Sequence, residues 1–185
     1  MRPVSRALAS LPGRRPFGLA LSLGALLLCA SAAWGEDLPE YRLKAAFLYN
    51  FAMFTEWPAE VGNKLNLCVL GQDPFGVELD ALNDKPIGAR NIVVQRVTER
   101  QPLNGCQLLF IAAPAIGALP RVLEAVKGSP VLTVADSPNA AREGVAINMA
   151  LRDSKVLFEV NLRAVHGARL NLSSKLLRLA REVHR

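Results

Sequence analysis

Two cysteines, Cys68 and Cys106, are the residues whose type and number point most clearly to chemistry. Both lie outside the N-terminal 35 residues, which have the pattern of an export signal. The third cysteine, Cys29, leaves with that segment, and an even number of cysteines in the exported chain is typical of disulfide pairing, so we expect one Cys68–Cys106 disulfide. Two unpaired buried thiols are the alternative. A structural crosslink and a redox switch both stay open, because only strained or exposed disulfides are easily reduced.

Other candidates for catalytic or metal chemistry lack the residues that such chemistry needs. Gly71 and Gly76 have the spacing of the two glycines in a phosphate-binding loop, but Val77–Glu78 stand where Lys and Ser or Thr are required. The two histidines, His166 and His184, have no partner at metal-ligand spacing in the sequence. We therefore predict no cofactor and no metal site.

Ser137 is the remaining candidate nucleophile, and its surroundings favour a structural role. No G-x-S-x-G motif is present, and residues 136–139 predict a turn in which Asp and Ser side chains hydrogen-bond the backbone. A hydrolase is the least favoured class, although a catalytic triad can be assembled from distant residues.

The first 35 residues are predicted to be a cleavable export signal. Four arginines between positions 2 and 15 precede an apolar run, Phe17–Cys29, which is shorter than the roughly 20 residues that span a bilayer. Small residues follow and predict cleavage after Gly35, with Ala32 and Ala33 as alternatives. An uncleaved anchor is the alternative to cleavage, and Arg14–Phe17 leaves a twin-arginine route open.

Removal of the export signal lowers the net charge of the chain. The whole chain has 22 Lys and Arg against 16 Asp and Glu, a net charge of +6, and loss of the four signal arginines lowers this to +2. A nucleic-acid-binding domain needs a concentrated basic face, so we expect no nucleic-acid partner. Residues 36–185 have the length of one domain.

The first predicted helix covers residues 37–55 and ends before Trp57–Pro58, because the residue before proline avoids helical geometry. Its aromatic and aliphatic side chains recur every three or four positions and share one face; they are Leu43, Phe47, Phe51 and Phe54. Arg42, Lys44 and Asn50 fall away from that face. We expect the face to pack in the core, with partner binding as the alternative.

Strands and helices alternate after this helix. Strands are predicted at 65–70, 91–97, 106–112 and 131–134, helices at 77–82 and 116–127, a hairpin at 144–149 and 155–160, and helices at 162–166 and from 173 or 174 to 182. This order predicts a three-layer α/β domain with a mostly parallel central sheet, helices on both faces and an antiparallel C-terminal hairpin.

Five segments, taken in their order and spacing, match the pattern of a known family. They are Tyr41–Phe51 continuing into Phe54–Pro58, Cys68–Gly76, Val131–Asp136, Phe158–Asn161 and Leu172–Leu177. Together they resemble the YfiR family, and the resemblance extends from about Tyr41 to Glu182.

The resemblance implies a periplasmic α/β protein without enzymatic activity. Founding members of the family repress a membrane-bound diguanylate cyclase by binding its periplasmic part, and an OmpA-like outer-membrane lipoprotein can sequester the repressor. Cys68 and Cys106 lie where family members have a disulfide. A second cysteine pair that some members have near Asp136–Met149 has no counterpart here. The implied role is repression of cyclic-di-GMP signalling and biofilm formation.

A periplasmic protein that binds a small ligand is the alternative function. A large polar pocket would favour it, whereas a convex apolar patch would favour a protein partner. Trp57 and Pro58 are candidate partner-binding residues, since they follow the helix where its apolar stripe ends. Their alternative role is to close the core beside the helix end. The particular partner, the input signal and a homodimer stay open.

Export predicts a processed protein. We expect mass spectrometry of the periplasmic product to find a chain that starts near Glu36, because the small residues before it form the cleavage site. A cytoplasmic product that keeps Met1 would contradict this prediction.

Overall fold

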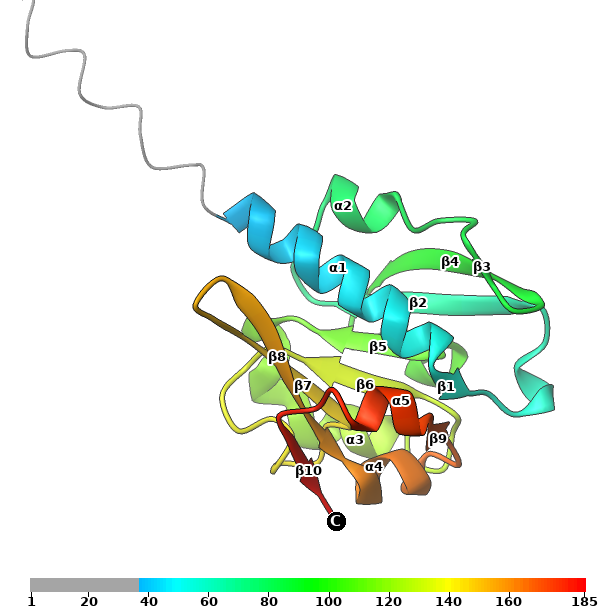
Figure 1. Cartoon of the computed structure of the whole chain (residues 1–185). Coiled ribbons are helices and arrows are strands. Elements are labelled where there is room, and N and C mark those ends of the chain that lie inside the picture. The colour runs from blue at the N-terminus through cyan, green and yellow to red at the C-terminus, as the bar shows by residue number, and fades with distance from the viewer. Residues whose placement is uncertain (1–36) are drawn as a thin grey trace, which may run out of the picture. The chain divides into compact units, whose positions relative to one another are not determined.

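The computed structural model describes residues 37–185, in which a mostly parallel sheet of eight strands lies between helices (Figure 1). The signal-peptide prediction lies outside the described residues. The strands are β2 (Lys64–Leu70), β3 (Pro86–Ile87), β4 (Arg90–Val97), β5 (Leu108–Ile111), β6 (Leu132–Ala135), β7 (Ile147–Arg152), β8 (Lys155–Asn161) and β10 (Glu182–His184).

The order across the sheet is β10-β8-β7-β6-β5-β2-β4-β3. Neighbours from β4 to β7 run parallel, β8 returns antiparallel to β7, and β10 lies parallel to β8. The predicted α/β class, with a largely parallel sheet and an antiparallel C-terminal hairpin, is therefore confirmed.

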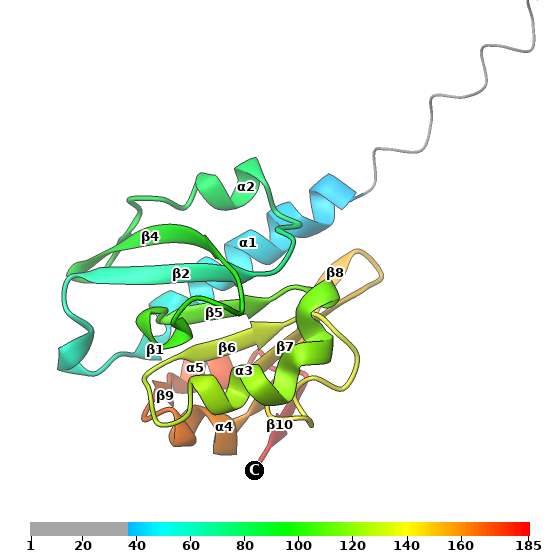
Figure 2. The same ribbon diagram turned by 180° about the vertical axis from the view of Figure 1, so that it is seen from behind.

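Helices cover both faces of this sheet. The long helix α1 (Asp37–Met53) crosses one face, and α3 (Leu119–Ala125) lies on the opposite face (Figure 2). Shorter helices complete the side of α1; they are α2 (Val77–Asp80), α4 (Leu162–Gly167) and α5 (Ser174–Leu177). No helix within residues 37–185 is both long and apolar enough to cross a membrane.

Alternation along the strands divides the core in two. Leu67 and Val69 of β2 pack with the α1 side, whereas Cys68 and Leu70 of the same strand pack with the α3 side. Successive side chains of a strand point to opposite faces, so a sheet that is buried on both sides needs apolar residues at nearly every position. The buried runs in β5 and β6 have this character.

The C-terminal region differs from the sequence-based prediction of one helix through Glu182. Ser173 caps α5 as expected, since its hydroxyl accepts from the Leu176 amide, but the helix ends at Leu177. Residues 182–184 then form β10, where Val183 lies in register with Val160 of β8. Pairing with an existing sheet edge outweighs local helical preference here.

Two further elements differ from the sequence-based prediction, each for a local reason. The predicted helix at 116–127 is a 3-10 segment, Ala113–Ala118, followed by the shorter α3, and each carries a proline at its start. A two-stranded antiparallel ribbon, β1 (Thr55–Glu56) with β9 (Asn171–Leu172), was not predicted. It holds the end of α1 against the C-terminal region, and two residues are too few for a periodic pattern.

Candidate functional site

Lys44 is a buried cation on α1, with 3% of its surface exposed. The sequence-based prediction placed it away from the buried face, and this was wrong. The buried face of α1 is formed by Lys44, Ala45, Leu48, Phe51 and Ala52. The helix is therefore rotated from the predicted orientation, so that Leu43 is exposed while Phe47 and Phe54 are half-buried.

Burial of this lysine is balanced by two carboxylates. Its Nζ donates to Oδ2 of Asp136 at 2.6 Å and pairs with Glu40, one turn earlier on α1. The Tyr41 hydroxyl donates to the same Asp136 oxygen at 3.3 Å. The side chains of both Lys44 and Asp136 are 4% exposed, so their charges have little access to water.

The pKa values of this cluster follow from its contacts. Burial by itself lowers the pKa of Lys44, but hydrogen bonds from its ammonium to Asp136 and Glu40 outweigh this and raise the pKa above its usual value. Burial and the neighbouring Asp136 charge raise the pKa of Tyr41. Lys44 therefore stays charged and Tyr41 stays protonated at neutral pH.

The cluster joins α1 to the edge of the sheet where ligands bind in many α/β proteins. Asp136 directly follows β6, at the carboxyl end of a parallel strand. Removal of one partner from a buried ion pair leaves the other charge unbalanced, at a cost of about 3 kcal/mol or more. The pair therefore determines where the N-terminal half of α1 can lie.

A pocket of about 590 Å³ opens beside this cluster. Its walls are the N-terminal part of α1, the loop that follows β6, and the β7–β8 hairpin with residues just before β10. Its charged lining residues are Glu40, Lys44, Asp136, Arg142, Arg152, Glu159 and Arg181. Four cations thus face three carboxylates around a space large enough for a small molecule.

Two buried polar residues also line the pocket. Ser137 and Asn148 are 6% and 7% exposed, and the Ser137 Oγ and Asn148 Oδ1 atoms have no hydrogen-bond partner among the described residues. We predicted that the side chains of Asp136 and Ser137 hydrogen-bond the backbone of their turn, and this was wrong. The Asp136 carboxylate accepts from Lys44 and Tyr41, and the Ser137 hydroxyl is unpaired. Both unpaired atoms are costly in a buried site unless something binds them.

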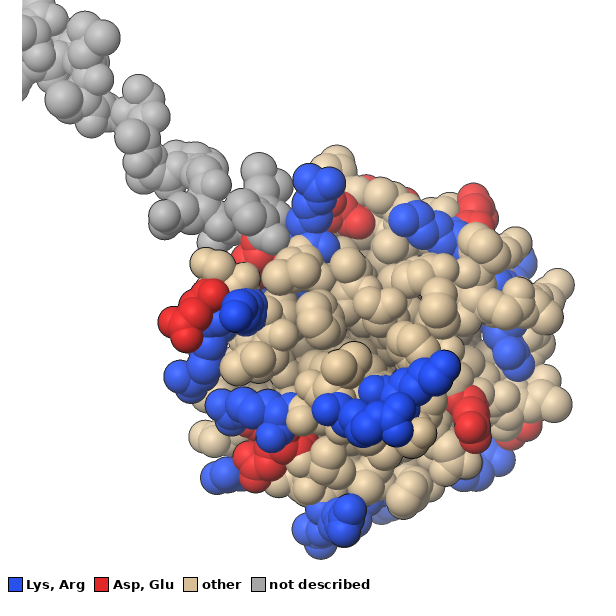
Figure 3. Space-filling model, viewed as in Figure 1, with Lys and Arg blue, Asp and Glu red and all other residues tan. Residues whose placement is uncertain are grey.

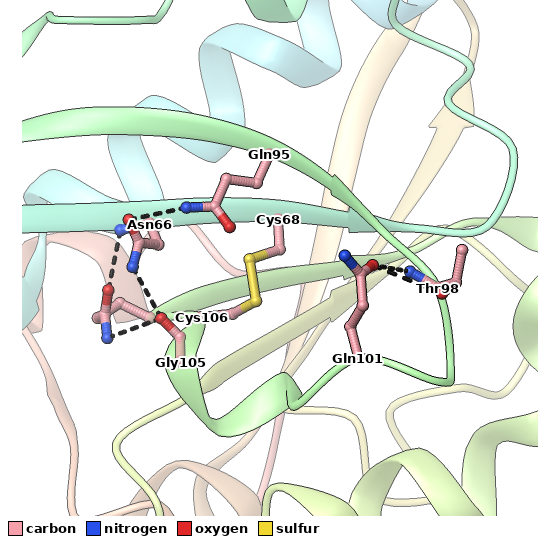
Figure 4. The surroundings of a disulfide bond; sticks show 8 residues. Asn66, Cys68, Gln95, Thr98, Gln101, Gly105 and Cys106 are labelled. Carbon is pink, nitrogen blue, oxygen red and sulfur yellow. Dashed lines mark hydrogen bonds between the residues drawn. A yellow bond between two sulfur atoms is a disulfide. The ribbon is translucent and has the colours of Figure 1, made fainter.

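The two cysteines meet on the other face of the sheet, where Cys68 of β2 and Cys106, just before β5, form a disulfide (Figure 4). Their Cα atoms are 5.8 Å apart, and both residues are buried. Asn66 adds hydrogen bonds beside the disulfide: its side-chain amide donates to the Gly105 carbonyl and accepts from Gln95. We propose a structural crosslink rather than a redox switch, since a reductant cannot easily reach a buried bridge.

Trp57 and Pro58 lie at the end of α1, beside the β1–β9 ribbon. The Trp57 indole donates to the Ala52 carbonyl at 2.8 Å, and its half-buried ring packs against the core. The Pro58 carbonyl accepts from Arg90 at 3.4 Å. This arrangement satisfies the helix end and leaves part of each residue accessible, so their role in partner binding stays a proposal.

A group of metal-ligand residue types forms where β8 meets β10. Glu159, Glu182 and His184 offer ligand atoms within 4.8 Å of one another. The sequence showed no partner for His184 at metal-ligand spacing, and the strand β10, which was not predicted, brings Glu159 next to it. Arg181 pairs with Glu159, and Arg142 lies 4.0 Å from Glu182. Glu159 therefore already has a close cationic partner.

An exposed face of α1 completes the candidate sites. Leu43, Ala46, Asn50 and Met53 are exposed at spacings of three, four and three, which places them on one side of the helix. Figure 3 shows a largely uncharged surface where α1 crosses the front, with Lys and Arg side chains gathered below it. The exposed Arg42 lies at one end of this face, four residues before Ala46, and the remaining face, apart from Asn50, is apolar, as is typical of a protein-interaction surface.

The described residues thus form an α/β domain with a polar pocket at one end of the sheet and an exposed face on α1. A family model described as YfiR/HmsC-like matches residues 41–181. The match covers more than half of the sequence, and the chain belongs to the YfiR/HmsC-like family. A search of curated proteins found no match.

The disulfide should contribute substantially to stability. In the double variant Cys68→Ala/Cys106→Ala we expect a loss of roughly 4 kcal/mol, because the bridge closes a loop with a sequence separation of 38. For a domain of this size that corresponds to a melting temperature lower by roughly 10 °C. An unchanged melting temperature would contradict a structural role. Ready reduction of the native protein by a mild thiol would favour the redox switch instead.

Proposed function

We propose that this chain is a periplasmic regulatory protein that represses a membrane-bound diguanylate cyclase by binding the cyclase's periplasmic part. Membership of the YfiR/HmsC-like family supports a regulator in cyclic-di-GMP signalling. The proposal includes export with removal of residues 1–35 and a role without catalysis.

The exposed face of α1 is the observation that carries the proposal of a protein partner. Leu43 and Met53 are 37% and 43% exposed on a helix whose opposite side is fully buried. Phe47 and Phe54, half-buried beside them, widen the apolar strip, and Trp57 extends it past the helix end. Aromatic and Met side chains are enriched at the centres of protein interfaces.

A repressor without catalytic residues must act by binding one state of its partner more tightly than another. A tenfold shift between active and inactive cyclase needs about 1.4 kcal/mol of differential binding. One aromatic or aliphatic side chain at the centre of an interface can supply that difference. The face of α1 therefore has enough apolar side chains for the required bias.

An OmpA-like outer-membrane lipoprotein is a second proposed partner, by resemblance to the founding members of the family. If this lipoprotein releases the cyclase by sequestering the repressor, it must compete for the surface of the repressor that binds the cyclase. A homodimer through α1 would cover the same face, so its dissociation would precede repression. Binding of a small ligand does not exclude a regulatory role, because a signal can act through differential binding to two states.

Charge placed on this face should relieve repression without unfolding the protein. We expect Met53→Glu and Leu43→Glu to raise cellular cyclic-di-GMP towards the level of a deletion strain, because a desolvated carboxylate opposes an apolar interface. Each residue is more than half buried, so we expect a loss of about 1 kcal/mol, which lowers the melting temperature by about 2–4 °C and leaves the protein folded.

Ala125→Glu is the matched control, because Ala125 is exposed on α3 at the opposite face of the sheet. It should leave cyclic-di-GMP unchanged. The proposal fails if deletion of the gene leaves cyclic-di-GMP flat in a strain that contains the cognate cyclase. If deletion raises the level but both α1 variants still repress, the partner binds elsewhere.

A further inference from the structure

We propose that the pocket beside Lys44 and Asp136 binds a small hydroxylated anion, such as a hydroxycarboxylate or the phosphate ester of a polyol. This inference goes beyond the repressor function and does not depend on it, because the pocket and the exposed face of α1 are different surfaces. It follows from the unpaired polar atoms in the pocket wall, the charges around it and its size.

The buried wall of the pocket holds a hydrogen-bond acceptor that no donor of the described residues reaches. Asn148 Oδ1 is an acceptor without a partner among residues 37–185, and the residue is 7% exposed. The Lys44 ammonium binds Asp136 and Glu40 and makes no hydrogen bond to this oxygen. A ligand hydroxyl would supply the missing donor, and the Ser137 hydroxyl, equally unpaired, can donate to or accept from a second hydroxyl.

Buried polar groups close to the pocket are hydrogen-bonded, in contrast to these two atoms. Thr133, a buried polar residue on the same sheet, is satisfied because its hydroxyl accepts from the Ala146 amide at 3.0 Å. Asn161, close in sequence to Glu159 of the pocket, uses its side chain to bind the Ala141 carbonyl and to cap α4. Comparable groups nearby are thus paired, whereas Ser137 Oγ and Asn148 Oδ1 are not; the other two unpaired buried atoms within residues 37–185, Arg90 Nε and His184 Nε2, belong to side chains that do not line the pocket.

The rim of the pocket favours a negative charge. Arg142, Arg152 and Arg181 line it with exposed side chains, and only Arg181 has a close carboxylate partner, Glu159. Arg142 lies 4.0 Å from Glu182, and Arg152 is in no ion pair within the described part of the chain. A guanidinium group binds carboxylate or phosphate through two parallel hydrogen bonds. A cationic ligand would meet more positive than negative side chains, so the lining of the pocket favours an anionic ligand.

Size and position agree with this ligand class. A volume of about 590 Å³ lies within the range of small-molecule sites, roughly 300–1,000 Å³. The pocket lies at the carboxyl ends of β6 and β7, the strand ends at which α/β sheets bind ligands, and the strand order itself reverses between β2 and β5, where a second hollow lies. Since Glu40 and Lys44 of α1 form part of the wall, an occupied pocket would also contact the helix that carries the exposed apolar face.

Calorimetric titration of the purified, processed protein tests the proposal with matched probes. We expect L-malate or sn-glycerol 3-phosphate to bind with a dissociation constant of about 1 mM or tighter. Succinate, which is malate without its hydroxyl, should bind at least about tenfold more weakly, because it leaves Asn148 unpaired. Uncharged glycerol should not bind measurably at about 10 mM.

Variants locate the binding. Asn148→Leu and Arg152→Gln should each weaken the binding of L-malate or sn-glycerol 3-phosphate at least about tenfold, by loss of a hydroxyl acceptor and of an anion contact. Arg121→Gln is the control, because Arg121 lines a separate hollow beside Gly71 and Thr98. Arg152→Gln keeps the test valid if Asn148→Leu fails to fold, since Arg152 is exposed.

Three results would overturn the proposal. The first is no binding of either hydroxylated anion at about 10 mM. The second is equal affinity for malate and succinate, which would show charge attraction alone. The third is equal weakening by Arg121→Gln and Arg152→Gln, which would show non-specific binding to surface arginines. None of these results bears on repression of the cyclase, which is measured in cells.

Discussion

The buried ion pair of Lys44 with Asp136 is the interaction on which the arrangement of this protein depends. Without it, α1 would have to place a charged side chain against an apolar sheet or turn to another face. With it, the N-terminal half of α1 is attached to the end of β6, and Glu40 and Tyr41 complete the hydrogen bonding. A buried pair need not add much net stability, but it penalises every orientation in which the charges separate.

Both binding surfaces follow from that orientation. Because Lys44 faces the sheet, Leu43 and Met53 face solvent, and the helix presents an apolar strip instead of burying it. Because Asp136 is held at the helix, the loop after β6 leaves a space between itself and the β7–β8 hairpin, into which Ser137 and Asn148 face. The β1–β9 ribbon holds the other end of α1, and the disulfide braces β2 and β5 on the opposite side of the sheet.

The sequence predicts the sheet well because its strands are short, apolar and separated by clear turns. Residues 65–70, 91–97 and 155–160 correspond to β2, β4 and β8 within one residue at each end. The short C-terminal strand β10 has no comparable signal, because its pairing with β8 exists only in the folded chain. Short elements that depend on a distant partner are the least predictable part of the fold.

The candidate sites were harder to predict than the fold. An amphipathic pattern treats lysine as exposed, and one of the two carboxylates that balance its burial, Asp136, lies 92 positions away. A signal was nonetheless present: Lys44 lies four residues before Leu48 and eight before Ala52, a spacing that places all three on one helical face. The pocket could not be predicted, because its walls come from segments far apart in the sequence.

A double-mutant cycle measures directly whether the ion pair holds α1 in place. Unfolding free energies would be compared for Lys44→Met, Asp136→Asn and the double variant at neutral pH. We expect each single change to cost about 3 kcal/mol and the double change to cost clearly less than the sum, with a coupling of at least about 1 kcal/mol. Costs that add to within about 0.5 kcal/mol would show that the two side chains act independently and that α1 is oriented by its apolar contacts alone.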